Sequence, residues 1–314
     1  MAANSPTPQT TGTLAHSKLM MKHRILLILI FLPIEIFSQT RGIIIDKKTR
    51  NPIEYANIWI ENQNIGTTSS LDGKFHFNVN AIGKRLIVSA IGYETNYSLI
   101  ENENSTIELN PKTYEISEVV VRPKKNTIEL KIDEYKKSSV NYFFGCGTYP
   151  WIVAKYFKFL PSYERTPYLK KLTVLTESRG KPSTFNLRLI NVGENGEPST
   201  DIQKENIIVE AKRGKRNVTV DLSEYNIQFP KSGFFVAVEW LIIESNKNVF
   251  EYKTKETKKV VSEIRYEPLF GVAKYDKEFD NWTYTNGSWR KSKIAPPIMM
   301  DKAGDLAIEL TLSN

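Results

Sequence analysis

Residues 41–110 break into short runs of β type at the spacing of a sandwich, and this spacing constrains the fold more than any other feature of the sequence. Turn residues separate the runs, and helical periodicity is absent throughout. Short strands joined by such turns are typical of small all-β sandwiches. The segment therefore predicts a seven-stranded sandwich from RGIIID, IEYANIWIE, GTTSS, GKFHFNV, RLIVSAIG, TNYSLIE and STIELN, with turns at Asn51-Pro52, Gly66, Asp72-Gly73, Gly83 and Gly92.

Longer β-type runs resume after residue 142 and predict a second, larger β-sandwich, for which a jelly roll is the candidate topology. In FNLRLI, Phe185, Leu187 and Leu189 share one face of the predicted strand, while Asn186 and Arg188 take the other. The runs are YLKKLTVLTE, STFNLRLINV, ENIIVEAK, RNVTVDLS, GFFVAVEWLII, SEIRYEPLFG, NWTYT, SWRKS and DLAIELTLS. The expected organisation is all-β with two sandwich domains. An upstream extension and signal peptide occupy residues 1–38, the small sandwich 39–112, a charged linker 113–141 and the larger sandwich 142–314.

The small sandwich carries a series of motifs in a specific order. They are Gly42 and Asp46, Asn51-Pro52-Ile53, Ala56-Asn57-Ile58, Gly66-Thr67-Thr68-Ser69, Asp72-Gly73-Lys74-Phe75, Leu86-Ile87-Val88-Ser89 and Ile91-Gly92-Tyr93. Over about residues 41–111, the chain thereby resembles the carboxypeptidase-like regulatory domain family, a transthyretin-like or prealbumin-like sandwich common in exported proteins of Bacteroidetes. The chain departs from the family at Ser70, where the family often has Asp. The resemblance implies a non-catalytic module of the kind found beside peptidases, receptors and adhesins. The larger sandwich is not assigned to a named family.

The front of the chain has the pattern of a cleavable signal peptide. The basic segment MMKHR precedes the apolar run ILLILIFL, and Ser38-Gln39 follows as a cleavage site. The run before Pro33 is far shorter than the roughly 20 residues of a membrane-spanning helix. A buried helix is the alternative, but Pro33 and Glu35 disfavour it. Residues 1–19 are polar and rich in Pro and Thr, which does not suit a signal peptide, so we expect the signal to start after them. The exported protein should begin near Gln39, have no transmembrane helix, and lie in the periplasm, peripherally on the outer membrane or at the cell surface.

Export leaves the chain with a modest positive charge. Removal of residues 1–38 takes away three basic side chains and one acidic one, so the formal charge falls from +8 to +6. The basic clusters at 212–216 and 253–259 lie where turns are expected between apolar runs. A solvated hairpin tip explains such clusters better than a polyanion site does. We therefore expect no nucleic-acid partner.

The scarcity of histidine and cysteine argues against several enzyme classes. His76 is the one histidine beyond the predicted signal peptide, which excludes a zinc site of the HExxH type. It alternates with Phe75 and Phe77, so we expect an exposed imidazole on a strand rather than a catalytic base. Cys146, the single cysteine, has no partner for an internal disulfide and is expected to be structural. No metal site, cofactor or catalytic residue is predicted.

One carboxylate, Glu239, interrupts an otherwise apolar run at 234–243. The run predicts a central strand that lies between its sheet and covering loops. If Glu239 is buried, it needs a partner and can have the raised pKa of a general acid. Exposure at a sheet edge, or pairing with a neighbouring Lys or Arg, is the favoured alternative.

The segment EISEVVV at 115–121 resembles the TonB box of nutrient receptors in Bacteroidetes, an extended peptide that a partner adds to its sheet. Such a receptor also needs a 22-stranded barrel with about 220 residues in its strands. Fewer residues than that follow position 121. A terminal strand or connector of the small sandwich is therefore favoured over a box that TonB reads.

The stretch NWTYTNGSWRK at 281–291 contains the strongest hairpin signal of the chain. The Asn-Gly pair at its centre favours a type I′ turn, because both positions accept positive φ. The resulting register places Trp282, Tyr284 and Trp289 on one face of a β-ribbon. Such rings can stack on the faces of sugars, so these three are the candidate ligand-binding residues. The alternative is that they cover the end of a core.

These features predict an exported, non-enzymatic protein of the cell envelope that binds a protein partner or a surface glycan. Two alternatives stay open. One is a polysaccharide-acting hydrolase that uses a carboxylate pair in the larger sandwich. The other is an accessory to a TonB-linked uptake system.

Export has a direct test. We expect the mature protein to begin at or near Gln39, because a signal peptidase cuts after a small residue such as Ser38. N-terminal sequencing of the protein recovered from envelope and cytoplasmic fractions measures this. Full-length protein in the cytoplasm, beginning at Met1, would contradict the prediction.

Overall fold

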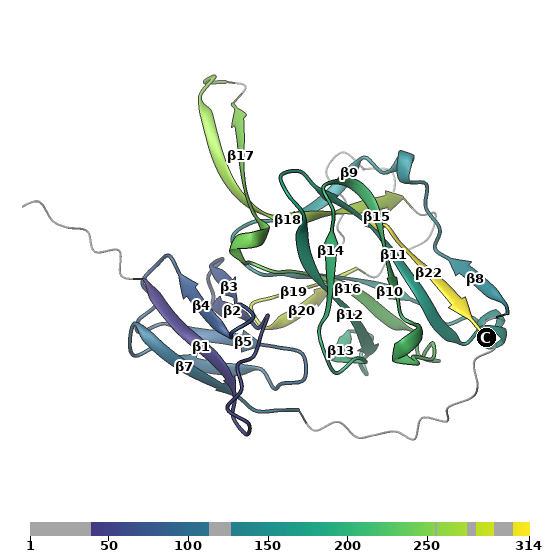
Figure 1. Cartoon of the computed structure of the whole chain (residues 1–314), viewed down its shortest axis with the longest axis horizontal. Helices are drawn as coiled ribbons and strands as arrows, with labels where there is room; N and C mark the ends of the chain where they lie inside the picture. The colour runs from purple at the N-terminus through teal and green to yellow at the C-terminus, as the bar shows by residue number, and fades with distance from the viewer. Residues whose placement is uncertain (1–38, 113–126, 255, 275–280, 292–303) are drawn as a thin grey trace, which may run out of the picture. The chain divides into compact units, whose positions relative to one another are not determined.

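The computed structural model describes residues 39–112, 127–254, 256–274, 281–291 and 304–314 (Figure 1). These residues form strands and four short 3-10 turns without an α-helix, which confirms the all-β prediction. None of the described residues belongs to a helix long and apolar enough to cross a membrane. The described residues from Gln39 onward cluster into one compact unit, and residues 1–38 lie outside the described part of the chain.

Seven strands form the small sandwich that the sequence predicts. They are β1 (Thr40–Asp46), β2 (Asn57–Ile60), β3 (Gly66–Thr68), β4 (Lys74–Phe77), β5 (Arg85–Ser89), β6 (Asn96–Leu99) and β7 (Asn104–Leu109). A three-stranded sheet has the order β4-β1-β7, and a four-stranded sheet has the order β3-β2-β5-β6. The core between them contains Ile44, Ile58, Phe75, Leu86 and Val88.

Asp46 connects two of the sequence motifs of the small sandwich, its own and the one that contains Tyr93, through hydrogen bonds. Its Oδ1 accepts hydrogen bonds from the backbone N–H groups of Lys48 at 2.7 Å and Thr49 at 2.9 Å. The hydroxyl of Tyr93 donates to its Oδ2 at 3.0 Å. The Thr49 backbone hydrogen bond is the main cause that lowers the pKa of Asp46. Burial, followed by the contact with Asp46, raises the pKa of Tyr93 to about 12.

Gly73, in the motif Asp72-Gly73-Lys74-Phe75, has a φ of +72° and lies against the backbone of β1, so the turn requires glycine.

The larger sandwich contains two sheets. Its strands are β8 (Glu129–Ile132), β9 (Tyr142–Cys146), β10 (Ile152–Phe157), β11 (Tyr168–Ser178), β12 (Ser183–Val192), β13 (Pro198–Asp201), β14 (Ile207–Ala211), β15 (Gly214–Asp221), β16 (Phe234–Trp240), β17 (Lys247–Lys253), β18 (Val260–Lys274), β19 (Trp282–Thr285), β20 (Ser288–Lys291), β21 (Gly304–Leu306) and β22 (Ile308–Ser313). The inner sheet has the order β13-β12-β16-β10-β19-β20, with β14 paired to β12. The outer sheet has the order β17-β18-β11-β22-β8, with β15 paired to β11, and with β9 and β21 paired to β18. The 3-10 turns are η1 (Lys137–Ser139), η2 (Pro161–Arg165), η3 (Ser223–Tyr225) and η4 (Glu244–Asn246).

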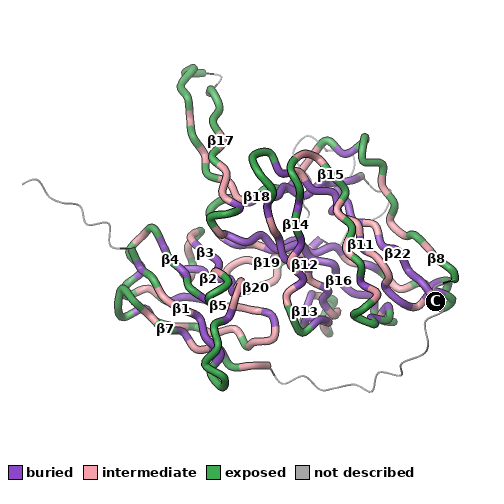
Figure 2. Tube along the Cα trace, in the orientation of Figure 1, coloured by how far each residue is buried: buried purple, intermediate pink, exposed green. Residues whose placement is uncertain are grey.

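The inner and outer sheets enclose the main core. Alternate residues of β12 and β16 point into it, among them Phe185, Leu187, Leu189, Phe234 and Trp240. Figure 2 shows buried positions concentrated along these central strands. The inward face predicted from FNLRLI is confirmed, because its three apolar residues are fully buried.

The opposite face of the inner sheet is also covered, so all seven residues of β16 are buried. On this face Phe235, Ala237 and Tyr284 pack with Trp59 of β2 and Ile87 of β5. The alternate residues of β2 and β5 therefore serve two different cores. The expectation that loops would cover β16 is wrong, because the four-stranded sheet of the small sandwich takes that place.

The range 113–141, predicted as a linker, is described only from residue 127 onward. Within it, β8 pairs with β22 at the edge of the outer sheet. Edge strands often carry charged side chains. The sequence around residue 131 is charged for this reason, so its pattern did not predict β8. The predicted runs also omit β9, β10, β13 and β17, and the run DLAIELTLS joins β21 and β22 into one strand.

Candidate functional site

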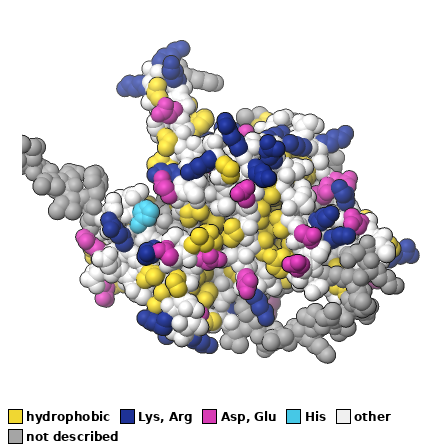
Figure 3. All heavy atoms as spheres, viewed as in Figure 1, with side chains coloured by type: hydrophobic (Ala, Val, Ile, Leu, Met, Phe, Trp, Pro, Cys, Tyr) yellow, Lys and Arg dark blue, Asp and Glu magenta, His cyan; other side chains and the backbone are white. Residues whose placement is uncertain are grey.

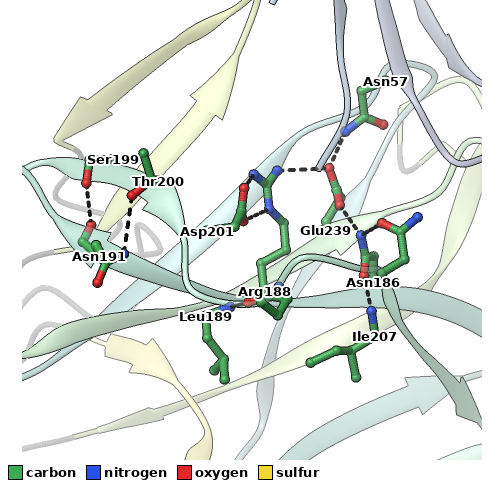
Figure 4. Close-up of polar contacts among 12 residues, drawn as sticks. Asn57, Asn186, Arg188, Leu189, Asn191, Ser199, Thr200, Asp201, Ile207 and Glu239 are labelled. Atoms are coloured by element: carbon green, nitrogen blue, oxygen red, sulfur yellow. Dashed lines mark hydrogen bonds and ion pairs between the residues drawn. The ribbon is translucent and has the colours of Figure 1, made fainter. Parts of the chain in front are cut away.

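Glu239 lies where the small sandwich meets the inner sheet (Figure 4). Asn57 of β2 donates to its Oε1, and Arg188 of β12 donates to the same oxygen at 3.3 Å. Asn186 of β12 donates to Oε2 at 2.7 Å. Glu239 is only 3% exposed. Pairing with a neighbouring Arg is thus confirmed, and exposure at a sheet edge is wrong.

Arg188 joins two carboxylates. Its Nε and Nη2 donate to the two carboxylate oxygens of Asp201, each at 2.8 Å. Burial alone would lower the pKa of Arg188, but attraction to Asp201 and Glu239 outweighs burial and raises it. One guanidinium then faces two carboxylates, and the buried group has an excess of negative charge when both are ionised. Burial is the main cause that raises the pKa of Glu239, and the charge of Asp201 acts in the same direction, whereas Arg188 and the amides of Asn186 and Asn57 act in the other.

Asn186 connects this group to the neighbouring strand. Its Oδ1 accepts a hydrogen bond from the backbone N–H of Ile207 at 3.1 Å, and its Nδ2 also donates to Asn206 at 2.8 Å. Buried polar groups that are fully hydrogen-bonded make a structure rigid and specific. We call Asn57, Asn186, Arg188, Asp201 and Glu239 the polar cluster. Its arrangement suits a structural lock between the two sandwiches.

Three further contacts fix the small sandwich against the larger one. The indole Nε1 of Trp59 donates to the carbonyl oxygen of Pro150 at 2.8 Å. The backbone N–H of Ile242 donates to Oγ1 of Thr68 at 2.9 Å. Gly66 approaches the ring of Pro150 so closely that a Cβ atom would collide with it. The contact is therefore specific in both its polar and its apolar parts.

The hairpin predicted at 281–291 is confirmed in its turn and register. Asn286 and Gly287 have φ values of +49° and +75°, as a type I′ turn requires. Tyr284 lies opposite Trp289. The tip packs on the small sandwich, because a Cβ at Gly287 would lie 2.9 Å from a methyl carbon of Ile87.

The candidate ligand-binding rings of this hairpin are Trp282, Tyr284 and Trp289. Tyr284 is 9% exposed, and its ring centre lies 5.6 Å from that of Trp59 and 5.1 Å from that of Trp289. Trp282 and Trp289 are half-buried against the same apolar cluster. This packing favours the alternative that the rings cover a core, and glycan binding by them stays a prediction.

A cleft of about 630 Å³ opens beside the contact between the sandwiches. Lys74 and Lys247 bring positive charge to it, and each is paired with a carboxylate, Asp72 at 2.6 Å and Glu244 at 3.3 Å respectively. His76 also lines the cleft, and its predicted exposure on a strand is confirmed. The lining is Ile65, Gly66, Thr67, Thr68, Ser70, Lys74, His76, Phe77, Asn78 and Val79 from the small sandwich, and Thr148, Ile242, Ile243, Glu244, Lys247, Ile264 and Tyr266 from the larger one.

Cys146 is buried in the larger sandwich, with its Sγ 3.2 Å from the carbonyl oxygen of Tyr149. Burial raises the pKa of the thiol well above its ordinary value. A nucleophilic cysteine needs the thiolate form, so this environment suits a structural residue. Within the described ranges, no group of three or more His, Cys, Asp or Glu side chains is placed to hold a metal ion.

Sequence reasoning identifies Glu239 but misses its partners. Asn186 and Arg188 alternate with apolar residues, which shows that β12 has one polar face. The alternation does not show that another domain covers this face. One signal could have revealed the partners. β16 is apolar on both faces, so both faces of its sheet must be covered, and the polar face of its neighbour β12 must be covered as well.

The pKa of Glu239 leads to a testable pH dependence. Folding raises the pKa of Glu239 above 4.5, its ordinary value in the unfolded chain. Between these two pKa values the folded protein keeps a proton that the unfolded chain releases. The stabilising contribution is full below 4.5 and is lost as the pH rises through the folded value. We therefore expect the parent protein to lose stability relative to Glu239→Gln as the pH rises. Urea unfolding of both proteins from about pH 4 to about pH 8 measures the difference.

The matched control is Glu101→Gln, at an exposed carboxylate of the small sandwich. Its stability difference from the parent should vary much less with pH. If the parent instead gains stability relative to Glu239→Gln as the pH rises, the attraction of Arg188 outweighs burial and the expectation fails.

The comparisons with known proteins concern the small sandwich. A family model described as CarboxypepD_reg-like domain matches residues 40–121. This range contains β1 to β7 and extends over the segment 115–121, which lies outside the described residues. No curated protein matches the chain. The resemblance expected from the motifs is thus confirmed, and residues 40–121 of this chain match the CarboxypepD_reg-like domain family.

Proposed function

We propose that this protein is exported to the cell envelope and binds a ligand there without catalysing a reaction. The cleft of about 630 Å³ is the single observation that carries the proposal. Ligand sites in proteins are concave, often have volumes of about 300–1,000 Å³, and occur preferentially where domains meet. This cleft is within that range, and both sandwiches supply its walls.

The lining of the cleft suits a surface glycan better than a protein partner. Asn78 and Thr148 are exposed in the cleft and offer amide and hydroxyl groups that can exchange hydrogen bonds with sugar hydroxyls. Apolar side chains and the ring of Tyr266 offer surface for the apolar face of a sugar ring. A protein partner would need a broader surface than a cleft of this size provides.

The walls of the cleft are held in place before any ligand arrives. Thr68, a lining residue of the small sandwich, accepts the hydrogen bond from the backbone of Ile242, a lining residue of the larger one. The polar cluster holds the same two bodies together nearby. A site that is already ordered loses less conformational entropy on binding, so this rigidity supports affinity.

The non-enzymatic part of the proposal rests on the state of the best-placed carboxylates. A glycosidase needs two carboxyl groups that face each other across a sugar. Glu239 and Asp201 are instead buried and bridged by Arg188. A sugar ring has no access between them, so they support a structural role and not the hydrolase alternative.

The envelope location rests on the signal-peptide pattern of residues 20–39. In that compartment the protein would meet surface glycans in the periplasm or at the outer membrane, where we propose a peripheral association. The alternative role in TonB-linked uptake depends on the segment 115–121, and no described residue bears on it.

The binding site has a blocking test. Thr148 is exposed in the cleft wall, so the indole of Thr148→Trp should obstruct part of the cleft. We expect the variant to lose at least about tenfold in affinity for any envelope glycan that the parent binds on a glycan array. The matched control is Thr106→Trp on β7, which is exposed at the edge of the three-stranded sheet away from β4.

Equal binding by the parent and Thr148→Trp would show that the ligand lies elsewhere. Turnover of a glycan that is abolished by replacing a Glu or Asp residue would overturn the non-enzymatic part of the proposal.

A further inference from the structure

A concentration of basic side chains lies outside the cleft, among the residues that the structure describes. Two segments far apart in sequence meet near the start of β15, where the Nζ of Lys215 donates to the carbonyl oxygen of Val140 and the hydroxyl of Tyr135 donates to Asn217 at 3.1 Å. Figure 3 shows Lys and Arg side chains gathered over this end of the larger sandwich. We call the basic residues of the two segments the basic patch: Lys136, Lys137, Lys212, Arg213, Lys215 and Arg216.

The basic patch is not neutralised by neighbouring carboxylates. None of its six side chains belongs to an ion pair within the described part of the chain. Glu177 lies opposite Lys215 in the β11–β15 register, but it pairs with Arg179 at 3.6 Å. The nearby exposed carboxylates, Glu134 and Glu210, form no ion pair with the patch. A concentration of one sign of charge on this scale attracts anions from solution.

The shape of the basic patch suits a polymer. An open hollow of about 530 Å³ is lined by Lys136, Lys137, Ser138 and Lys215. The guanidinium of Arg216 donates from Nε to the carbonyl oxygen of Arg213 at 2.8 Å, which orders the turn beside the hollow. Arginine forks bind carboxylate, sulfate or phosphate groups through paired hydrogen bonds, and the lysines add mobile positive charges.

We propose that the basic patch is a second binding site, separate from the cleft, and that its ligand is an acidic polysaccharide. The sequence cluster at 212–216 alone fits a solvated hairpin tip. The fold changes this interpretation because it adds Lys136 and Lys137 from a distant segment to the same surface. Neither residue lines the cleft, so this site does not depend on the proposed function.

Two other anionic partners fit less well. Single-stranded nucleic acid needs free aromatic rings on which bases can stack. At the patch, Lys215 lies over the ring of Phe143 at 5.7 Å, and the hydroxyl of Tyr135 is bonded to Asn217. A membrane surface would favour large exposed apolar side chains. None of the exposed large apolar residues of the described chain falls within residues 133–140 or 211–217.

The test compares two polymers that share a backbone. Dextran sulfate and neutral dextran differ in the sulfate groups that carry the negative charge, and polygalacturonate supplies carboxylates in place of sulfates. We expect the full chain to bind both acidic polymers, with affinity that falls as salt is raised, and not to bind dextran. The double variant Lys136→Glu with Lys137→Glu should weaken binding by about tenfold or more, and so should Lys212→Glu with Arg213→Glu. Thr148→Trp should leave this binding unchanged.

The matched control is Lys158→Glu with Lys204→Glu. Both lysines are exposed and lie outside the patch, and the pair changes the net charge by the same amount. Circular dichroism confirms that each variant is folded. If the control variant loses as much affinity for the acidic polymers as the patch variants do, net charge alone explains the loss. Tighter binding of a single-stranded oligonucleotide or of anionic lipid vesicles, lost in the same variants, would assign the patch to those ligands. Each of these outcomes, or the absence of binding to either acidic polymer, would overturn the proposal.

Discussion

The hydrogen bond from Asn57 to Glu239 is the interaction on which the rest of the structure depends. A buried carboxylate is costly unless donors surround it, and the described part of the larger sandwich supplies two, Asn186 and Arg188. The small sandwich completes the set. The same docking buries Trp59 and Ile87 against the inner sheet and places the cleft at its margin. The small sandwich thus acts as part of the larger one's core and as one wall of its candidate binding site.

Much of the fold follows from local pattern. Alternating residues and turn glycines predict all seven strands of the small sandwich, and Asn286-Gly287 fixes a hairpin in the correct register. The pattern fails where a strand breaks its own alternation. In β10, Lys155 stands among apolar residues and is 0% exposed. Its Nζ is satisfied by the carbonyl oxygens of Leu306 and Ile308 and by Asp133, and none of these partners is visible in the sequence.

The candidate site was less predictable, for a physical reason. Strand alternation tells which residues share a face, but it does not tell what covers that face. Arg188 and Asn186 have the pattern of an exposed face, and Trp282, Tyr284 and Trp289 have the pattern of a sugar platform or a core. In each case the small sandwich decides the outcome, through contacts between residues more than a hundred positions apart.

Calorimetry of the chain from Gln39 onward tests the central claim, that the two sandwiches share buried surface and form one cooperative unit. Separating them would expose the apolar cluster around Trp59 and remove the hydrogen bond from Asn57 to Glu239, so neither sandwich should unfold alone. The account predicts a single transition whose calorimetric and van't Hoff enthalpies agree. Two resolved transitions, with the smaller one unaffected by Asn57→Ala, would contradict it.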